Sequence, residues 1–229
     1  MIKVISFDVG GTLLIDDDNA NRNNYGLREL TDLLNLPYEN VRNSYKKVFQ
    51  TKKGTLNELI DIFCNELEIK PFQKLNEFFY NKFNRSQQGT ISSENIFLIN
   101  TLKNEGYKII LFSNSCCLLN NNALNDIVDC IDDIFYSYDI GYTKDDEESY
   151  KYIEEKLNVK PSEILHIGDT LKSDYYMPKR NGWNVLYYGK TDDTNINSIS
   201  SLTDLYGILK KTTNEIGGNG NGKKRSIYI

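Results

Sequence analysis

Five short apolar runs, each ended by a turn or a polar residue, recur along the chain and have the composition of β-strands. They occupy residues 3–7, 108–113, 132–137, 163–168 and 184–189. Helical patterns precede the later runs, at residues 93–106, 145–158 and, in a short polar segment, 173–182. Alternation of strands with helices implies right-handed crossovers, which place helices on both faces of a sheet. The sequence therefore predicts an α/β fold with a mostly parallel sheet.

One long segment interrupts this alternation, because residues 16–92 contain no convincing strand. Apolar residues recur there at spacings of three and four in several stretches, which Pro37, Gly54 and Pro71 separate. This pattern predicts a bundle of about four helices, inserted after the first strand as a cap or lid beside the sheet. The alternative is a purely structural extension of the fold.

The insertion divides the predicted chain into a core, a cap and a tail. The core comprises residues 1–15 and 93–210, and the cap comprises residues 16–92, which begin with a polar, Asn-rich linker at 16–24. Glycine and asparagine dominate residues 211–229, which we therefore expect to form a disordered or loosely docked tail.

Composition narrows the possible partners. The chain has a net charge of -5 and a pI of about 5.1, which argues against nucleic acid because phosphate binding needs a basic surface. No apolar run approaches the ~20 residues that span a bilayer, and no secretory signal precedes the first strand, so we expect no membrane contact and a cytosolic location. The four cysteines lack metal-ligand spacing, and a single histidine, His166, excludes metal sites built from several histidines. The sequence leaves the oligomeric state open.

Polar residues follow one predicted strand after another. Asp8 follows the first strand, Ser113 and Asn114 follow the second, Lys144 follows the third after a loop, and Asp169 follows the fourth. Ligands of open parallel sheets bind outside the carboxyl ends of the strands. Two carboxylates, a lysine and a hydroxyl group at one edge describe a site for a phosphate held against Mg²⁺, with Asp8 placed to attack phosphorus.

Each of these residues also has a structural explanation when taken alone. Asp8 and the Ser113-Asn114 pair are typical of turns and helix N-caps. Lys144 resembles a solvated surface residue, and the acidic residues 145–148 suit the start of a helix. The functional interpretation therefore depends on their order, with one polar group at each strand end.

Four short motifs together resemble those of the haloacid dehalogenase-like hydrolase superfamily. The first, D-x-D-x-T/V-L after an apolar strand, matches "FDVGGTLL" except that Gly10 replaces the second Asp. The second matches "IILFSN" at Ser113, and the third, often G-x-x-K-P, matches "GYTKD" at Lys144. The fourth, G-D-S/T followed by another Asp, matches "HIGDTLKSD" and is the most specific. The resemblance covers residues 1–210 and implies a Rossmann-like sheet with an inserted helical cap.

The resemblance also implies roles for individual residues. Asp8 would be the nucleophile that forms an aspartyl-phosphate and, with Asp169 and the backbone carbonyl of Gly10, would bind Mg²⁺. Thr12, together with Ser113 and Lys144, would hold the phosphoryl oxygens, and Lys144 would balance the charge of Asp8. Asn114, which follows the second predicted strand, is added to these, so the candidate phosphate ligands are Thr12, Ser113, Asn114 and Lys144. Asp174 would support Lys144 or the metal shell, and His166 would pack rather than react.

Gly10 is the clear departure from the family pattern. The second Asp of the motif usually acts as general acid and then as general base, and a positioned group of this kind contributes about 10²–10⁴-fold. Glycine cannot transfer a proton, so ordinary phosphatase turnover is in question. Asp16, Asp17 and Asp18 are expected to be linker charges, with a minor possibility that one replaces the missing acid.

Three functional hypotheses follow. The leading one is a Mg²⁺-dependent, phosphatase-type hydrolase of a small phosphorylated metabolite, with the cap selecting the substrate. The second keeps the attack by Asp8 but changes the reaction to phosphoryl transfer or to a dehalogenase-type displacement. The third is a catalytically weak protein that binds a phosphorylated ligand or a protein partner.

Overall fold

The fold is known from a computed structural model, which describes residues 1–14, 26–84, 89–119 and 122–217. The predicted linker at 16–24, with Asp16, Asp17 and Asp18, lies outside these residues, as does the end of the chain from residue 218. No described helix is long and apolar enough to cross a membrane.

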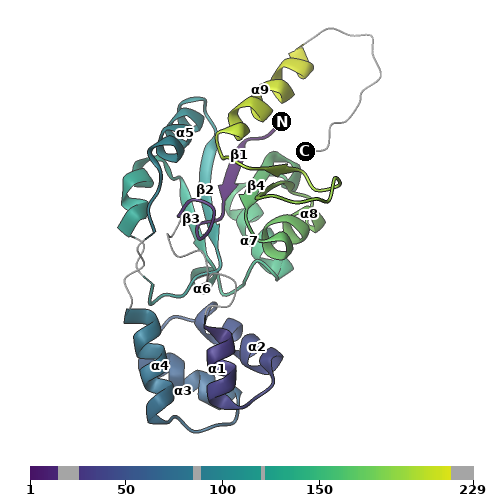
Figure 1. The fold of residues 1–229 in the computed structure, drawn as a ribbon. Coiled ribbons are helices and arrows are strands. Elements are labelled where there is room, and N and C mark those ends of the chain that lie inside the picture. The colour runs from purple at the N-terminus through teal and green to yellow at the C-terminus, as the bar shows by residue number, and fades with distance from the viewer. Residues whose placement is uncertain (15–25, 85–88, 120–121, 218–229) are drawn as a thin grey trace.

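A six-stranded parallel sheet forms the centre of the larger part of the molecule (Figure 1), in the order β3-β2-β1-β4-β5-β6. Its strands are β1 (Val4–Phe7), β2 (Lys108–Ser113), β3 (Asp133–Tyr136), β4 (Ile164–Gly168), β5 (Asn184–Tyr188) and β6 (Ser198–Ile199). The five predicted strands are confirmed, as is the α/β, Rossmann-like fold. The two-residue strand β6 is too short for a sequence pattern to reveal it.

Helices cover both faces of the sheet. They are α5 (Ser93–Asn104), η2 (Asn122–Cys130), α6 (Ser137–Ile140), α7 (Glu147–Leu157), η3 (Pro161–Glu163), η4 (Leu171–Tyr176), α8 (Met177–Arg180) and α9 (Asp204–Gly217). Helix α5 begins after Ser92, whose hydroxyl accepts a hydrogen bond from the backbone N–H of Asn95 and so caps the helix. The polar segment 173–182 is predicted as one short helix. It contains most of η4, which is a short π-helix, and then α8.

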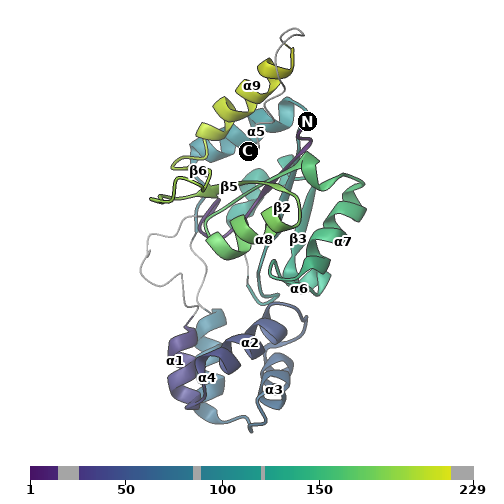
Figure 2. The same cartoon turned by 90° about the vertical axis from the view of Figure 1, so that its right-hand side faces the viewer.

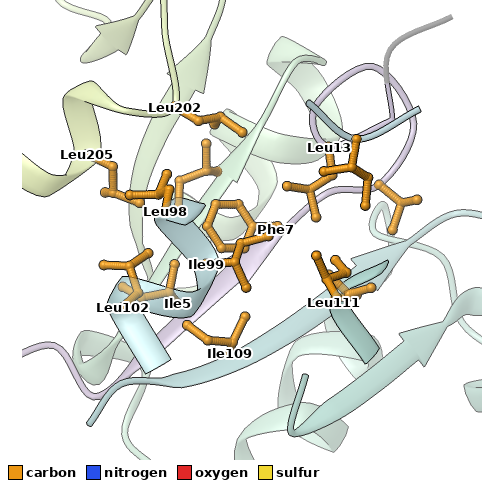
Figure 3. Packing of buried hydrophobic residues seen from close by; sticks show 14 of the residues in the cluster. Ile5, Phe7, Leu13, Leu98, Ile99, Leu102, Ile109, Leu111, Leu202 and Leu205 are labelled. Atoms are coloured by element: carbon orange, nitrogen blue, oxygen red, sulfur yellow. The ribbon is translucent and has the colours of Figure 1, made fainter. Parts of the chain in front are cut away.

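Alternate residues of the strands point into two different hydrophobic clusters. On one face Ile5 and Phe7 of β1 pack with side chains of α5 and α9 (Figure 3). On the other face Val4 packs with Tyr150 of α7 and with Trp183. All four residues of β1 are buried, and apart from Ser6 they are apolar, because both faces of a parallel strand are covered.

The inserted segment forms four helices, α1 (Leu27–Leu34), α2 (Tyr38–Phe49), α3 (Leu56–Glu66) and α4 (Gln73–Asn84). Helix α3 begins with a capping box between Thr55 and Glu58. The helices enclose a hydrophobic cluster of their own, in which Phe49 stacks on Phe79 with ring centroids 4.6 Å apart. Figures 1 and 2 place this bundle, which we call the cap, beyond the carboxyl ends of the strands.

The cap and the core touch through a loop and two ion pairs. Residues 116–119, which follow β2, pack against the hydrophobic cluster of the cap. Lys46 of α2 pairs with Asp145, and Lys53 pairs with Asp139 of α6. These contacts attach the cap beside the loop that carries Lys144.

Helix α9 extends further than the sequence pattern suggested. It continues to Gly217, so residues 211–217, assigned above to the tail, are helical. The segment Thr212–Ile216 contains no helix breaker, and the helix ends at the first of two consecutive glycines. The remaining part of the predicted tail lies outside the described residues.

Candidate active site

The register of the sheet brings the predicted polar residues to one edge. Phe7 pairs with Leu111 of β2 and with Ile167 of β4, so β1, β2 and β4 end at nearly the same level. Asp8 and Asp169 directly follow two of these strands, and Ser113 ends the third. Asp8 and Ser113 are buried, whereas Asp169 is half-buried.

Lys144 lies at the centre of this cluster with only 2% of its surface exposed. Its Nζ donates to Asp8 Oδ1 at 2.5 Å and to Asp174 Oδ1 at 2.6 Å. Three residues from separate motifs are therefore joined by one ammonium group. Lys144 is a buried ionic residue rather than the solvated surface lysine of the alternative explanation.

Two hydrogen bonds fix the backbone of Lys144. Its N–H donates to Asn114 Oδ1 at 2.8 Å, and its carbonyl accepts from the hydroxyl of Tyr150 at 2.7 Å. Asn114, predicted to bind phosphate, thus orients Lys144 through its side-chain oxygen. Tyr150 was missed, because a tyrosine at an apolar position of a helix gives no chemical signal in the sequence.

Asp174 has partners for both carboxylate oxygens. Besides Lys144, Oδ1 faces His166 Nε2 at 3.3 Å, and Oδ2 accepts from the backbone N–H of Thr170 at 2.9 Å. A carboxylate only accepts, so neutral His166 carries its proton on Nε2 and accepts from the hydroxyl of Ser6, 2.8 Å from Nδ1. This arrangement gives Asp174 the supporting position implied for it and makes His166 a buried structural residue.

The carboxylates also form a cluster of hard oxygen atoms. One oxygen from each of Asp8, Asp169 and Asp174 lies within 4.8 Å of the others. Oxygen ligands of this kind are the ones that Mg²⁺ prefers. Since both oxygens of Asp174 already accept hydrogen bonds, Asp8 and Asp169 are the residues best able to bind a metal.

The two adjacent glycines of the first motif are not equivalent. A Cβ at Gly11 would lie 2.0 Å from Asp169 Oδ2, and its φ of +89° is in the left-handed region. Among the described residues, a Cβ at Gly10 would meet no atom within 4 Å, and its φ is not left-handed. Gly11 is therefore required to leave room for Asp169, whereas nothing in the described part of the fold requires glycine at position 10.

Electrostatics separate the two carboxyl groups that share Lys144. Burial raises the pKa of Asp8 to about 7, against the lowering effect of the Lys144 ammonium. Burial also acts to raise the pKa of Asp174, but Lys144 and His166 outweigh it and hold that pKa well below its usual range. Burial lowers the pKa of Lys144, but the carboxylates of Asp174 and Asp8 raise it by more. The net effect is an increase in pKa, so Lys144 stays charged.

A family model for haloacid dehalogenase-like hydrolases matches residues 2–182 of the chain. The chain belongs to this hydrolase family. The match spans the strands that carry Asp8, Ser113 and Asp169, and it includes Lys144 and the whole cap. The membership predicted from the motifs is confirmed.

Solved structures of other proteins share the fold of this haloacid dehalogenase-like hydrolase. A 2-haloacid dehalogenase from Pseudomonas syringae pv. Tomato DC3000 is 17% identical, with a TM-score of 0.61 over 93% of this chain and 100% of that one. A predicted phosphoglycolate phosphatase from Haemophilus somnus 129pt is also 17% identical, with a TM-score of 0.59 over 91% and 98%. YfnB from Bacillus subtilis, described as a HAD-hydrolase bound to magnesium, is 22% identical, with a TM-score of 0.57 over 91% and 99%. No curated protein sequence matches the chain.

Thr12 belongs to the same motif as Asp8, four residues further along the chain. Its side chain is fully buried, and its Oγ1 has no hydrogen-bond partner among the described residues. Buried hydroxyl groups are normally hydrogen-bonded, so a free one has the chemistry to donate to a bound anion. The phosphate contact implied for Thr12 by the motif stays a prediction, and this free hydroxyl supports it.

Proposed function

We propose that this hydrolase is a Mg²⁺-dependent phosphatase-type enzyme that acts on a small phosphorylated molecule. The observation that carries the proposal is the Lys144 ammonium shared by Asp8 and Asp174, with Asp169 beside them. A carbon-halogen displacement has no need of a metal, so a retained cluster of hard oxygens favours phosphorus as the atom attacked. The net charge of -5 favours a small substrate over nucleic acid, and we propose a cytosolic location.

The residues present fit the metal that the family implies. Asp8, Asp169 and the backbone carbonyl of Gly10 would hold Mg²⁺, and all three offer oxygen atoms. When bound, the ion supplies positive charge that polarises a phosphoryl oxygen and offsets the charge on the phosphate. The family likeness to YfnB, which is described as bound to magnesium, supports this choice.

In the proposed reaction an oxygen of Asp8 attacks phosphorus, and the bond from phosphorus to the leaving oxygen breaks. Lys144 holds the Asp8 carboxylate in place and offsets charge on the phosphoryl group, while Thr12 and Ser113 donate to its oxygens. Water then attacks the aspartyl-phosphate, which releases phosphate and restores Asp8. Since Gly10 supplies no proton, the leaving oxygen must take one from water, which favours leaving groups of low pKa.

The test is phosphate release from p-nitrophenyl phosphate and a panel of sugar phosphates, with Mg²⁺ or with EDTA. We expect activity with Mg²⁺ in the wild type and none in Asp8→Asn. Asp126→Asn, which removes an exposed carboxylate of η2, is the matched control and should keep full activity. A folded wild-type protein that releases no phosphate from any compound with Mg²⁺ present would contradict the proposal.

The absence of a carboxylate at Gly10 also suits a second function, a displacement at carbon in which Asp8 attacks and no strong acid is needed. The structural likeness to a 2-haloacid dehalogenase keeps this function as the alternative. Halide release from a 2-haloacid in the presence of EDTA would establish it in place of the first. A third possibility, a protein that only binds, predicts that Asp8→Ala leaves biological activity unchanged.

A further inference from the structure

One side of cap helix α2 faces the core next to the candidate active site. The other side is buried in the cap through Val41, Tyr45, Val48 and Phe49. Lys46 reaches Asp145, the residue after Lys144, and Lys53, just beyond the helix, reaches Asp139 of α6. Figure 2 shows the end of α2 close to α6, as these two ion pairs require.

Gln50 lies on this side, between the two ion pairs. It follows Lys46 by four residues, which places both on one face of the helix a turn apart. Its residue surface is only 6% exposed, although it stands away from the positions that fill the cap cluster. Gln50, which directly follows α2, is therefore covered rather than solvated.

The side-chain oxygen of Gln50 is left without a partner. Its Oε1 is buried and forms no hydrogen bond with any residue that the structure describes. Buried polar side chains are normally satisfied, and an unsatisfied one costs free energy. Thr12, from the same motif as Asp8, carries the other unpartnered buried side-chain oxygen of the described residues.

The lysines that reach the core from this side are already paired. Lys46 and Lys172 both bind Asp145, the latter at 2.9 Å, and Lys53 binds Asp139. The unpartnered atom of Gln50 is a neutral amide oxygen. Such an oxygen accepts a hydrogen bond, so a hydroxyl group can donate to it.

We propose that Gln50 recognises a hydroxyl group on the leaving-group part of the substrate, which makes that substrate a polyol or sugar phosphate. The proposal rests on the proposed function, because the phosphate would lie on Lys144 while the rest of the molecule extends toward α2. A substrate with a second carboxylate or phosphate in this position fits less well, since Gln50 Oε1 is an acceptor and Lys46 and Lys53 are engaged in ion pairs.

The experiment compares substrates of similar shape with and without hydroxyl groups: glucose 6-phosphate against cyclohexylmethyl phosphate, and glycerol 3-phosphate against propyl phosphate. The quantity of interest is the ratio of kcat/KM within each pair, measured for wild type and Gln50→Leu. We expect the ratio to fall about tenfold in Gln50→Leu, the effect of one hydrogen bond. Hydrolysis of p-nitrophenyl phosphate, which has no hydroxyl group, should stay unchanged.

Thermal unfolding without substrate separates recognition from a structural role. Leucine removes an unsatisfied polar group at nearly constant size, so Gln50→Leu should unfold at the same or a higher temperature than wild type. The control Gln73→Leu changes an exposed glutamine of α4 and should alter neither the ratio nor p-nitrophenyl phosphate hydrolysis.

Three outcomes would each overturn one of the two claims. Equal ratios in wild type and Gln50→Leu, with p-nitrophenyl phosphate hydrolysed by both, would refute recognition by Gln50 and leave the proposed function standing. A lower unfolding temperature in Gln50→Leu with unchanged ratios would also refute it and show a structural role. A wild type that hydrolyses none of these phosphates would instead overturn the proposed function.

Discussion

Replacing Gly10 by aspartate should raise phosphatase activity without disturbing the fold. The position is exposed, a Cβ there meets no atom within 4 Å in the part of the chain that the structure describes, and the backbone is not left-handed. A substitution of this kind should change the free energy of unfolding by less than about 0.5 kcal/mol. Because a positioned acid contributes about 10²–10⁴-fold, we expect kcat to rise by up to that factor, or about 2.7–5.4 kcal/mol in activation free energy.

The assay is kcat for a sugar phosphate and for p-nitrophenyl phosphate, with Mg²⁺, in wild type, Gly10→Asp and Gly10→Asn. The gain should be larger for the sugar phosphate, whose leaving group needs a proton, than for p-nitrophenol. Asparagine matches aspartate in size but cannot transfer the proton, so Gly10→Asn should stay at the wild-type level. Equal gains in both variants, or no gain in a folded Gly10→Asp protein, would refute the reasoning.

The neighbouring glycine provides a contrasting variant. A Cβ at Gly11 would collide with Asp169, and the left-handed backbone there costs about 1–2 kcal/mol for other residues. Gly11→Ala should therefore lose Mg²⁺-dependent activity and some stability. If Gly11→Ala behaved like Gly10→Asn, the two positions would not differ in the way that the structure indicates.

Three further predictions concern stability. Lys144→Met removes the cation shared by two buried aspartates, so urea unfolding should show a loss of about 3–5 kcal/mol, and an unchanged midpoint would contradict the buried ion pair. Phe79→Ala should cost about 3–5 kcal/mol by calorimetry, whereas Tyr80→Ala, at a side chain that is 59% exposed, should cost less than about 0.5 kcal/mol. Burial acts to raise the pKa of Asp145, but its bonds to Lys46 and Lys172 outweigh burial and hold that pKa below its ordinary 3.8. The contribution of Asp145 to the free energy of unfolding is therefore present above pH 3.8 and is lost on acidification. Asp145→Asn should therefore lower stability at pH 7 and have little effect once the folded-state pKa has been passed, and an equal loss at both pH values would contradict the assignment.

Much of the fold follows from the order of patterns in the sequence. Strand β2 is Lys108–Ser113, the same residues as the apolar run, because a strand buried on both faces gives a continuous hydrophobic signal. The cap helices occupy the four amphipathic stretches because Pro37 and Gly54 separate them clearly. Helix α6 and strand β6 have only four and two residues, about one period of their kind, so no repeat of the pattern can show in the sequence.

The site was predictable at its strand ends and not in its supporting contacts. Asp8 and Asp169 could be placed because parallel strands bring their carboxyl ends to one edge. The bond from Asn114 to the Lys144 backbone depends on loop conformation, which residue spacing does not determine. The same holds for the difference between Gly10 and Gly11, which depends on how closely Asp169 approaches the turn.

The chain contains one histidine, and that histidine lies behind the cluster of aspartates. Its imidazole touches Asp174 but is fully buried and outside the proposed chemistry. A ¹⁵N spectrum of the protein would therefore contain one pair of ring nitrogens, which need no assignment by mutagenesis. Titration of phosphate or Mg²⁺ while this pair is observed would follow events at Lys144 through Asp174, so the molecule carries its own spectroscopic reporter.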